Sequence, residues 1–377
     1  MTRNSTSVTS IDTDRGLSSN QGGMTLIELM VGAVVAVVIA AAGFTILVTT
    51  NKATIANGQT VETQQNVRAA MDIISRDVKL AGFGMTAPVG SCATAIVPID
   101  ANAVGADTSP DSIRLLVPLG TSAAPAWTLT SAVGGAATLN KITLPSSPAP
   151  GAVANMVAEA GGSLDNAFIS LGGIVTAQVT SVSGNDINFA PIPPPAALPA
   201  GLPVYLLQCV TYDIGSTSAL CNGGTAPCLR RNTTAIAANA VAIMDGIEDI
   251  QFAYACDGCR TVINGGNPDR VIDDQAGAAG FDQADFVTNS LWGTPPMTPD
   301  KIRLVQVTVV GRQVNADQGT GEVNRSGLLS PTAWQVSDHN HAQGVFALND
   351  FNLLNPPYSS VRRRVLTRTV EVRNIGQ

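Results

Sequence analysis

The stretch that decides the fold is QGGMTLIELMVGAVVAVVIAAAGFTILV, Gln21 to Val48. From Met24 to Val48 the only charged side chain is Glu28, and the next charge along the chain is Lys52. An α-helix needs about 20 apolar residues to cross the hydrocarbon core of a bilayer, so this run predicts a membrane-spanning helix. A carboxylate inside such a helix is costly, and Glu28 is therefore a candidate functional residue.

The composition argues against two classes of protein. The chain has 28 acidic and 21 basic residues, a net charge of −7, whereas nucleic-acid binding needs a basic surface that displaces counterions. No phosphate-binding GxxxxGK[ST], metalloprotease HExxH or nucleophile GxSxG motif is present in the sequence. The sequence therefore predicts neither an enzyme nor a cofactor, and no nucleic-acid partner is expected.

All cysteines lie outside the apolar run: Cys92, Cys209, Cys221, Cys228, Cys256 and Cys259. An even number suits disulfides in an oxidising compartment. Sequence does not choose among the many possible pairings. Proximity favours the local pairs Cys221–Cys228 and Cys256–Cys259, which leaves Cys92 with Cys209.

The CDGC stretch that contains Cys256 and Cys259 has two alternative interpretations. It could be a redox pair, or it could join Cys221 and Cys228 in a zinc site. However, the pair follows a predicted strand rather than opening a helix, and Cys221 and Cys228 are too widely spaced for a typical zinc ribbon. A structural disulfide is the favoured interpretation.

The helical pattern continues beyond the apolar run. A narrow apolar stripe recurs every three or four residues, at Val67, Met71, Ile74, Val78 and Ala81. Gly82 and Gly84 then predict the end of the helix. A helix from Met24 to Leu80 is about 85 Å long at about 1.5 Å per residue. Its second half is expected to pack its stripe on a globular domain.

The remainder of the chain reads as strands. Short apolar runs at 112–119, 140–144, 167–184, 186–190 and 203–214 alternate with turn-rich segments. Three later runs, 247–255, 301–312 and 362–374, show the alternation of period two that suits an antiparallel sheet. The predicted fold is α+β: a long N-terminal helix packed on an antiparallel sheet, with a large loop- and strand-rich insertion.

The alternation also predicts which side chains share a face. Ile250, Phe252 and Tyr254 share one face of their strand. In the next strand Val305, Val307 and Val309 share a face, opposite Ile302, Leu304 and Val310. In the last strand Leu366, Val370 and Val372 are expected to point inward.

Two groups of polar residues are candidate metal sites. Four acids that follow the 247–255 strand could supply oxygen ligands to calcium: Asp257, Asp269, Asp273 and Asp274. Their spacing does not match the helix–loop–helix calcium motif, so a solvated loop is favoured and no metal is predicted. His339 and His341, the only histidines, lie on one loop and do not close a metal site by themselves.

Arg362, Arg363, Arg364 and Arg368 form a basic cluster near the C-terminus. The cluster could contact DNA, or it could be a solvated edge-strand face that discourages stray strand pairing. Tyr358 is the only aromatic residue near it, so stacking partners for nucleotides are lacking and the edge-strand interpretation is favoured.

The segment GGMTLIELMV resembles the N-terminal motif of type IV pilins and related pseudopilins. The resemblance implies that a prepilin peptidase cleaves between Gly23 and Met24 and then methylates the amine of Met24. Glu28 stands where the family keeps its acid, which implies that it neutralises the amine of a neighbouring subunit. Thr45 stands where many pilins have a helix-kinking proline, and this departure predicts a straighter or a differently melted helix.

Three further segments resemble the PilW family of minor pilins: NVRAAMDIISRDVKLAGFG at 66–84, DGIEDIQFAYACD at 245–257 and RRRVLTRTVEVRN at 362–374. The resemblance implies a leader at 1–23, a transmembrane and filament-core helix at 24–50 and an amphipathic second half at 51–84. A β-rich periplasmic or extracellular domain would occupy 85–377, with 85–200 as a low-charge region rich in Ala, Gly, Ser and Pro.

The function implied by this resemblance is a minor pilin that takes part in assembly or priming of a type IV pilus. Its partners would be the prepilin peptidase, other minor and major pilins and a tip adhesin. It would cross the inner membrane once and later enter the pilus. The alternatives are a pseudopilin of a type II secretion system, or a membrane-anchored binding or redox domain. Sequence leaves open the position at the tip or in the shaft, the surface that contacts partners and calcium binding.

Overall fold

The computed structural model describes residues 23–84, 92–100, 109–118, 128–133, 138–144, 167–184, 186–192, 197–221, 227–233, 240–261, 263–274, 280–288, 292–313, 334–336, 339–341 and 363–374, the backbone alone for 334–336 and 339–341. Two compact units divide the chain, Met1–Thr54 and Ile55–Gln377. The fold is α+β, as predicted from sequence.

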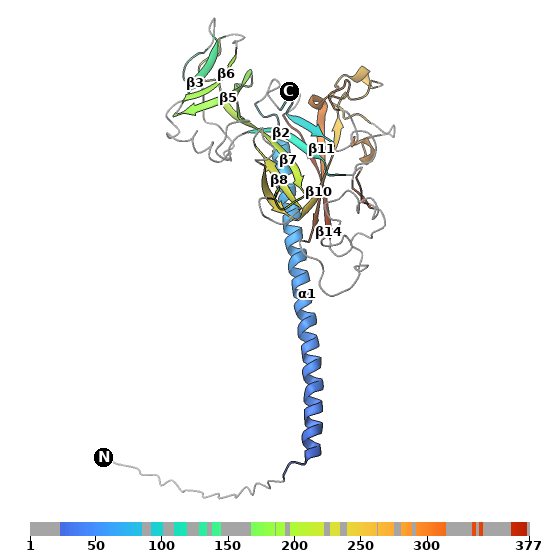
Figure 1. The fold of residues 1–377 in the computed structure, drawn as a ribbon. Helices are drawn as coiled ribbons and strands as arrows, with labels where there is room; N and C mark the ends of the chain where they lie inside the picture. Colours follow the sequence, from blue (N-terminus) through green and yellow to red (C-terminus); the bar gives the residue numbers. More distant parts are fainter. Residues whose placement is uncertain are drawn as a thin grey trace, which may run out of the picture. The chain divides into compact units, whose positions relative to one another are not determined.

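One long helix, α1 (Leu26–Leu80, 55 residues), contributes to both units (Figure 1). It passes through Thr45 without a break, and the Thr45 hydroxyl donates a hydrogen bond to the Ala41 carbonyl at 2.7 Å. The helix ends where the glycines predicted it would, because Gly82 and Gly84 adopt positive φ angles of 80° and 72°. Such angles are strained for residues with a Cβ atom.

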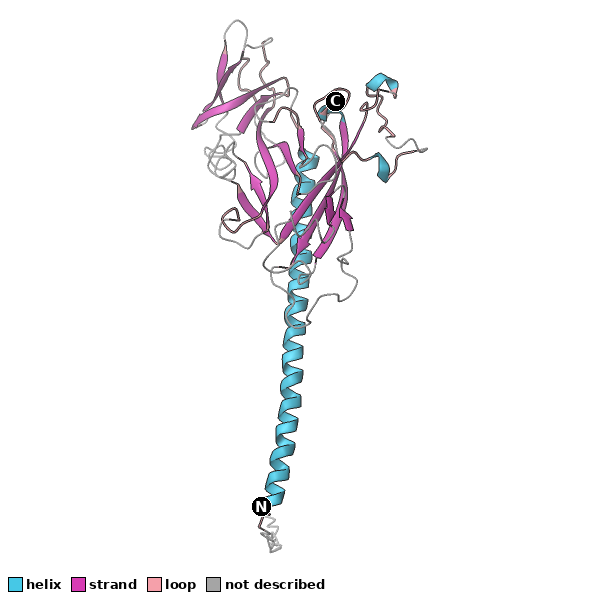
Figure 2. Ribbon diagram, turned by 45° about the vertical axis from the view of Figure 1, so that its right-hand side comes forward, coloured by secondary structure: helices cyan, strands magenta, loops and turns pink. Residues whose placement is uncertain are grey.

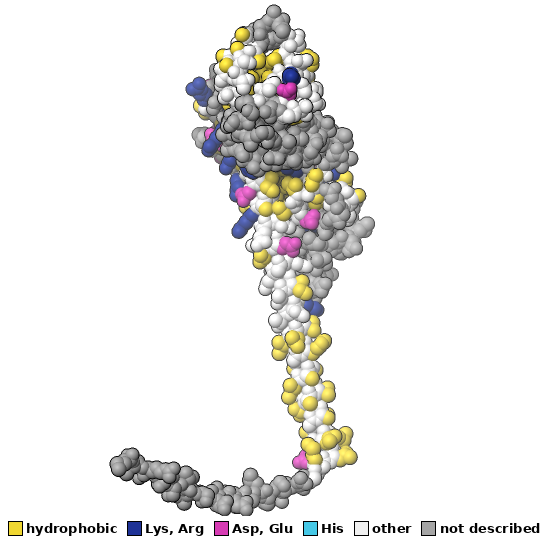
Figure 3. Space-filling model, turned by 90° about the vertical axis from the view of Figure 1, so that its left-hand side faces the viewer, with side chains coloured by type: hydrophobic (Ala, Val, Ile, Leu, Met, Phe, Trp, Pro, Cys, Tyr) yellow, Lys and Arg dark blue, Asp and Glu magenta, His cyan; other side chains and the backbone are white. Residues whose placement is uncertain are grey.

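The first unit presents apolar side chains around the helix, and none of them is buried within the chain. Leu26, Val34, Ile39 and Leu47 each expose 63–78% of their surface, and Figure 3 shows apolar side chains along the face of this segment that is in view. Among the described residues, α1 is the one helix that is long and apolar enough to cross a membrane.

The second unit begins with the other half of α1, which is amphipathic. The predicted stripe of Val67, Met71, Ile74, Val78 and Ala81 is at most 3% exposed. It lies in a core that also contains side chains of the nine-stranded and the three-stranded sheet. Figure 2 shows strands on either side of the last turns of the helix.

The larger sheet has nine described strands, all antiparallel to their neighbours, in the order β1-β2-β7-β4-β5-β6-β3, and β8 and β9 extend it from β7. The strands are β1 (Ile96–Ile99), β2 (Ser112–Pro118), β3 (Leu139–Thr143), β4 (Ala167–Leu171), β5 (Val175–Ser183), β6 (Asp186–Ile192), β7 (Val204–Gly215), β8 (Cys228–Asn232) and β9 (Val241–Asp245). Each of the five apolar runs predicted in this region forms at least one strand.

A second antiparallel sheet has the order β10-β11-β14, formed by β10 (Ile247–Cys256), β11 (Ile302–Arg312) and β14 (Arg363–Glu371). A separate pair consists of β12 (Trp334–Val336) and β13 (His339–His341). Three short 3-10 helices follow β10: η2 (Asn264–Gly266), η3 (Gln283–Asp285) and η4 (Pro299–Lys301).

The face predictions hold with one exception. Ile250, Phe252 and Tyr254 lie in the core beside Val305, Val307 and Val309, and so do Val370 and Val372, with Leu366 packed against them. The placement of Ile302 on the opposite face was wrong, because Ile302 is in the same core. The register shifts where Ala255 pairs with Leu304 and Cys256 with Ile302, and this irregularity reverses the alternation.

The insertion has a core of its own. Side chains from β3 to β7 form it, including Ile142, Ile169, Ile187, Phe189 and Leu206. β7 is long enough to supply Leu206 to this core and Val210 and Tyr212 to the core around α1. Leu207 and Cys209, which point to the other face of β7, belong to a third, small cluster that includes the Cys92–Cys209 disulfide. β7 therefore connects the insertion to the core around α1.

A polar contact fastens α1 to the larger sheet. The Tyr212 hydroxyl on β7 donates to the Asp77 carboxylate on α1 at 2.5 Å, and Arg231 on β8 lies 3.5 Å from the same oxygen. Tyr212 is fully buried. Burial and the Asp77 charge raise its pKa well above the ordinary value, since both disfavour a phenolate. This contact could not be predicted from sequence, because its members are far apart along the chain.

A second polar contact lies in the three-stranded sheet. Glu248 and Arg363 are only 4% and 3% exposed, and the Arg363 guanidinium donates to the Glu248 carboxylate. Arg312, also buried, lies 3.9 Å from the other Glu248 oxygen. Burial lowers the pKa of Arg312, and Glu248 opposes this effect. One carboxylate of β10 therefore pairs with guanidinium groups of β11 and β14.

We predict that Tyr212→Phe destabilises the protein by about 1–3 kcal/mol, because the buried Asp77 carboxylate loses a donor. The raised Tyr212 pKa adds a pH dependence. Its stabilisation is fully present below about pH 10, the ordinary tyrosine pKa, and is lost as the pH rises further. Chemical denaturation of the full chain in detergent at pH 8 and pH 11 measures both effects.

The matched control is Tyr205→Phe, which removes a hydroxyl but keeps the ring that packs edge-on against Phe83 at 5.2 Å. This control should leave stability within about 0.5 kcal/mol of the parent, as for most substitutions away from a buried polar contact. If Tyr212→Phe and Tyr205→Phe are equally stable at pH 8, the Asp77 contact does not fasten the helix.

Candidate functional site

The first candidate site is the head of α1. Gly23, Met24 and Thr25 are exposed and precede the helix without regular structure. Met24 exposes 73% of its surface, and nothing lies within 4 Å of the position that a Cβ atom at Gly23 would take. The Gly23–Met24 peptide bond is therefore accessible to an enzyme.

Glu28 caps the helix that carries it. One of its oxygens, Oε2, accepts hydrogen bonds from the backbone N–H and the hydroxyl of Thr25, each at 3.0 Å. In return, the Thr25 hydroxyl accepts a bond from the Glu28 N–H at 3.3 Å. This reciprocal arrangement is a capping box. Its T-x-x-E signature is visible in TLIE, and the sequence reasoning above missed it.

The capping box changes the interpretation of Glu28. The carboxylate already has two donors within its own chain, and the positive end of the helix dipole adds to their effect. Both bonds use Oε2, and Glu28 is exposed, so a second partner can reach the carboxylate. Local capping and pairing with another subunit are therefore compatible.

The cysteines form three disulfides, Cys92–Cys209, Cys221–Cys228 and Cys256–Cys259, and no cysteine is free. This is the pairing that proximity in the sequence favoured. Cys256 and Cys259 are 1% and 3% exposed, so their sulfurs are shielded from solvent. Burial of this kind suits a structural disulfide rather than an exchanging one.

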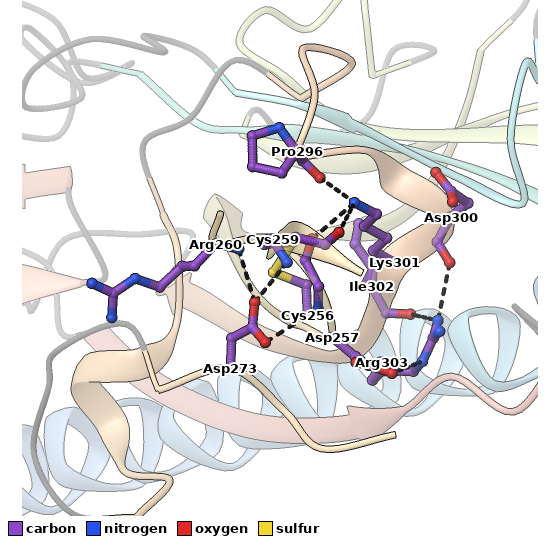
Figure 4. Close-up of a disulfide and its surroundings, with 12 residues drawn as sticks. Cys256, Asp257, Cys259, Arg260, Asp273, Pro296, Asp300, Lys301, Ile302 and Arg303 are labelled. Carbon is purple, nitrogen blue, oxygen red and sulfur yellow. Dashed lines mark hydrogen bonds and ion pairs between the residues drawn. A yellow bond between two sulfur atoms is a disulfide. The ribbon is translucent and has the colours of Figure 1, made fainter. Parts of the chain in front are cut away.

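The second candidate site is the loop that follows β10, residues 257–274 (Figure 4). Asp273, 3% exposed, accepts backbone N–H bonds from Gly258, Cys259 and Arg260 at 3.2, 2.6 and 2.9 Å. Asp257, 2% exposed, accepts N–H bonds from Asp269 and Arg270 at 2.8 and 3.1 Å. Both carboxylates therefore serve the backbone of the loop.

The loop also receives a cation from outside. The Lys301 ammonium on η4 donates to the carbonyl oxygens of Gly258, Gly266 and Pro296, each at 2.8 Å. Figure 4 shows this side chain beside the Cys256–Cys259 disulfide. Lys301 was missed from sequence, because it is separated from the loop by 3-10 helices and turns.

The four calcium candidates do not converge. Asp257 and Asp273 point at backbone N–H groups, Asp269 accepts a bond from the Val271 N–H at 3.0 Å, and the Asp274 carbonyl accepts one from Arg260. Within the described part of the chain, no three His, Cys, Asp or Glu side chains are arranged to hold a metal ion. The side chains of His339 and His341 lie outside the described residues.

The basic cluster is divided by the fold. The prediction of a solvated face was wrong for Arg363, which is buried against Glu248. Arg368 is exposed and pairs with Asp72 of α1 at 2.6 Å, while Arg364 is half-buried. Arg362 lies outside the described residues. Tertiary neighbours separate side chains that are adjacent in sequence, so no single basic surface results from these three.

Comparison with known families gives two matches. Residues 18–45, which contain the head of α1, match the prokaryotic N-terminal methylation motif. Residues 211–374, from β7 to the end of β14, match the family described as Type IV Pilus-assembly protein W, PilW. Searches of curated proteins and of solved structures gave no match.

Each match falls within one of the two compact units, the methylation motif in Met1–Thr54 and the PilW match in Ile55–Gln377. The methylation motif covers the accessible Gly23–Met24 bond and the capped start of an apolar helix. The PilW match covers β8 to β11 and β14, which pack on the second half of α1 and include the Cys256–Cys259 loop. Together the two matches support a PilW-like type IV minor pilin.

Proposed function

We propose that the mature protein begins at Met24, is held in the inner membrane by α1 with its C-terminal domain in the periplasm, and then enters a type IV pilus. It acts there as a structural subunit within a small complex of minor pilins that primes assembly, in contact with a tip adhesin. The leader at 1–23 is removed by prepilin peptidase. The PilW match and the methylation motif support this proposal.

The observation that carries the proposal is the unburied apolar surface of the first half of α1. Residues such as Val34, Ile39 and Leu47 expose more than 60% of their surface, so the described part of the chain leaves them largely uncovered. Exposed apolar area costs about 25 cal/mol per Å² in water, so this segment needs lipid or other helices around it. Membrane and filament core both provide such an environment, and transfer between them keeps the apolar surface buried.

Glu28 would determine how the helix is positioned against a neighbouring subunit when it enters the filament. In either environment the carboxylate would be costly without donors, and Thr25 supplies two of them. A methylated Met24 amine on an adjacent subunit would supply a positive charge to Oε1. A buried ion pair adds little net stability but fixes the relative position of its members. The pair would set the stagger between neighbouring helices.

A pseudopilin of a type II secretion system would share this anchor. The PilW match over β7 to β14 favours the pilus. A membrane-anchored redox domain would need a reactive thiol at Cys256, whereas both sulfurs of that disulfide are buried. The pilus subunit is therefore the better supported of the three.

We predict that Gly23→Ala blocks removal of the leader. The expected product retains residues 1–23, whereas the parent yields an N-terminal peptide that starts at N-methylated Met24. Mass spectrometry of membrane-purified protein distinguishes the two. Gly43→Ala, on the open surface of α1, is the matched control and should be processed normally. A processed Gly23→Ala product would rule out the proposed cleavage site.

We also predict that Glu28→Gln is processed and reaches the membrane, but enters pili at a level reduced about tenfold, equivalent to about 1.4 kcal/mol. Glutamine retains an oxygen for the Thr25 cap but removes the charge. Immunoblots of sheared pili and of membranes measure the ratio.

The control for this experiment is Thr25→Ala, which weakens the cap, by about 0.5–2 kcal/mol, but keeps the carboxylate charge. It should enter pili better than Glu28→Gln does. Equal incorporation of Glu28→Gln and the parent would contradict a role for the charge.

A further inference from the structure

We infer that the loop after β10 contains a cation site of the ammonium class whose occupant is the chain's own Lys301, so that the loop keeps its conformation without a bound metal ion. This inference does not depend on the proposed function. It starts from three contacts of equal length between one ammonium group and three backbone carbonyls.

The first step is the saturation of the ammonium. A lysine side chain has three N–H donors and no acceptor. Lys301 uses one donor each on Gly258, Gly266 and Pro296, all at 2.8 Å. The first two carbonyls belong to the loop and the third to the turn before η4. One side chain thus donates to two segments that are not adjacent in the sequence.

The second step concerns the class of cation. Calcium takes six to eight oxygens at about 2.3–2.6 Å, and carboxylates are usual among them. The oxygens around Lys301 Nζ are all backbone carbonyls, and their distance is longer. The two buried carboxylates of the loop point instead at backbone N–H groups. The site therefore fits a monovalent, ammonium-like ion.

The third step is that the backbone is shaped for this occupant. Gly258 and Gly266, whose carbonyls accept from Lys301, have φ angles of 89° and 80°, in the region that favours glycine. A Cβ atom at Gly258 would lie 2.7 Å from the Pro268 nitrogen, so a side chain is sterically excluded there. The same Gly258 donates its N–H to Asp273. Its two peptide groups thus connect the carboxylate with the ammonium.

Lys301 is itself held in place on both sides of its Cα atom. Its N–H donates to the Thr298 carbonyl at 3.0 Å, and its carbonyl accepts a bond from the Asp257 N–H at 3.0 Å. Arg303, two residues later, lies 3.7 Å from the Asp257 carboxylate. The start of β11 and the start of the loop are therefore fastened to each other, and the ammonium is delivered to the site by the sheet.

The test is hydrogen exchange of residues 257–274 in the full-length protein in detergent, with Lys301→Ala and Lys301→Met as variants. In the parent, neither EDTA nor CaCl2 should change the exchange. In both variants the Gly258, Cys259 and Arg260 amides should exchange about tenfold faster or more, since exchange reports local opening. Lys141→Ala, which removes an exposed lysine from β3, is the control and should leave the loop unchanged.

Chemical rescue then separates charge from packing. Methylammonium chloride should restore protection in Lys301→Ala, where space is vacated, but not in Lys301→Met, whose side chain fills that space. Choline chloride at the same ionic strength should restore it in neither.

Four results would overturn the inference: unchanged exchange in Lys301→Ala, parent-like exchange in Lys301→Met, failure of methylammonium to rescue Lys301→Ala, or an effect of EDTA on the parent loop. The second and third would assign the loop to neutral packing, and the last would assign it to a metal ion.

Discussion

The buried stripe on the second half of α1 is the constraint on which the globular domain depends. Val67, Met71, Ile74 and Val78 are enclosed by side chains from the larger sheet and from β10, β11 and β14. Both sheets contribute apolar side chains to the core around the helix, so each sheet buries its apolar face partly against α1. The same helix is apolar on all sides up to Val48 and amphipathic in the second compact unit, which begins at Ile55.

The polar contacts add direction to this packing. Apolar burial is not directional, and it would allow the helix to rotate or slide. Tyr212 and Asp77 fix one point between α1 and β7, and Arg368 and Asp72 fix another between α1 and β14. The two contacts lie on different sheets, and the buried Tyr212–Asp77 contact is the stronger constraint on the register of the helix, because an exposed ion pair adds little. The head of the same helix is fixed separately, by the Thr25–Glu28 capping box.

In the loop after β10, the charged side chains of Asp257, Asp273 and Lys301 form hydrogen bonds with backbone groups of opposite partial charge. Asp257 and Asp273 receive N–H groups, and Lys301 receives carbonyls. The Cys256–Cys259 disulfide closes the same region. Such a loop has little need of an external ligand to become ordered, because its own side chains satisfy the peptide groups that a loop would otherwise leave to solvent.

By itself, the sequence determined the elements with strong periodicity: α1, its end at Gly82, the strands of the apolar runs and the disulfide pairs close in sequence. It also contained the capping box, as TLIE. These signals are local, so a short window carries them. Only the tertiary structure decided the partners of Asp77, Arg363 and Lys301, the place of Ile302 after a register shift, and the strands β8 and β9. The physical reason is that a buried charge is acceptable only beside its partner, and those partners come from segments that meet only when the sheets close around the helix.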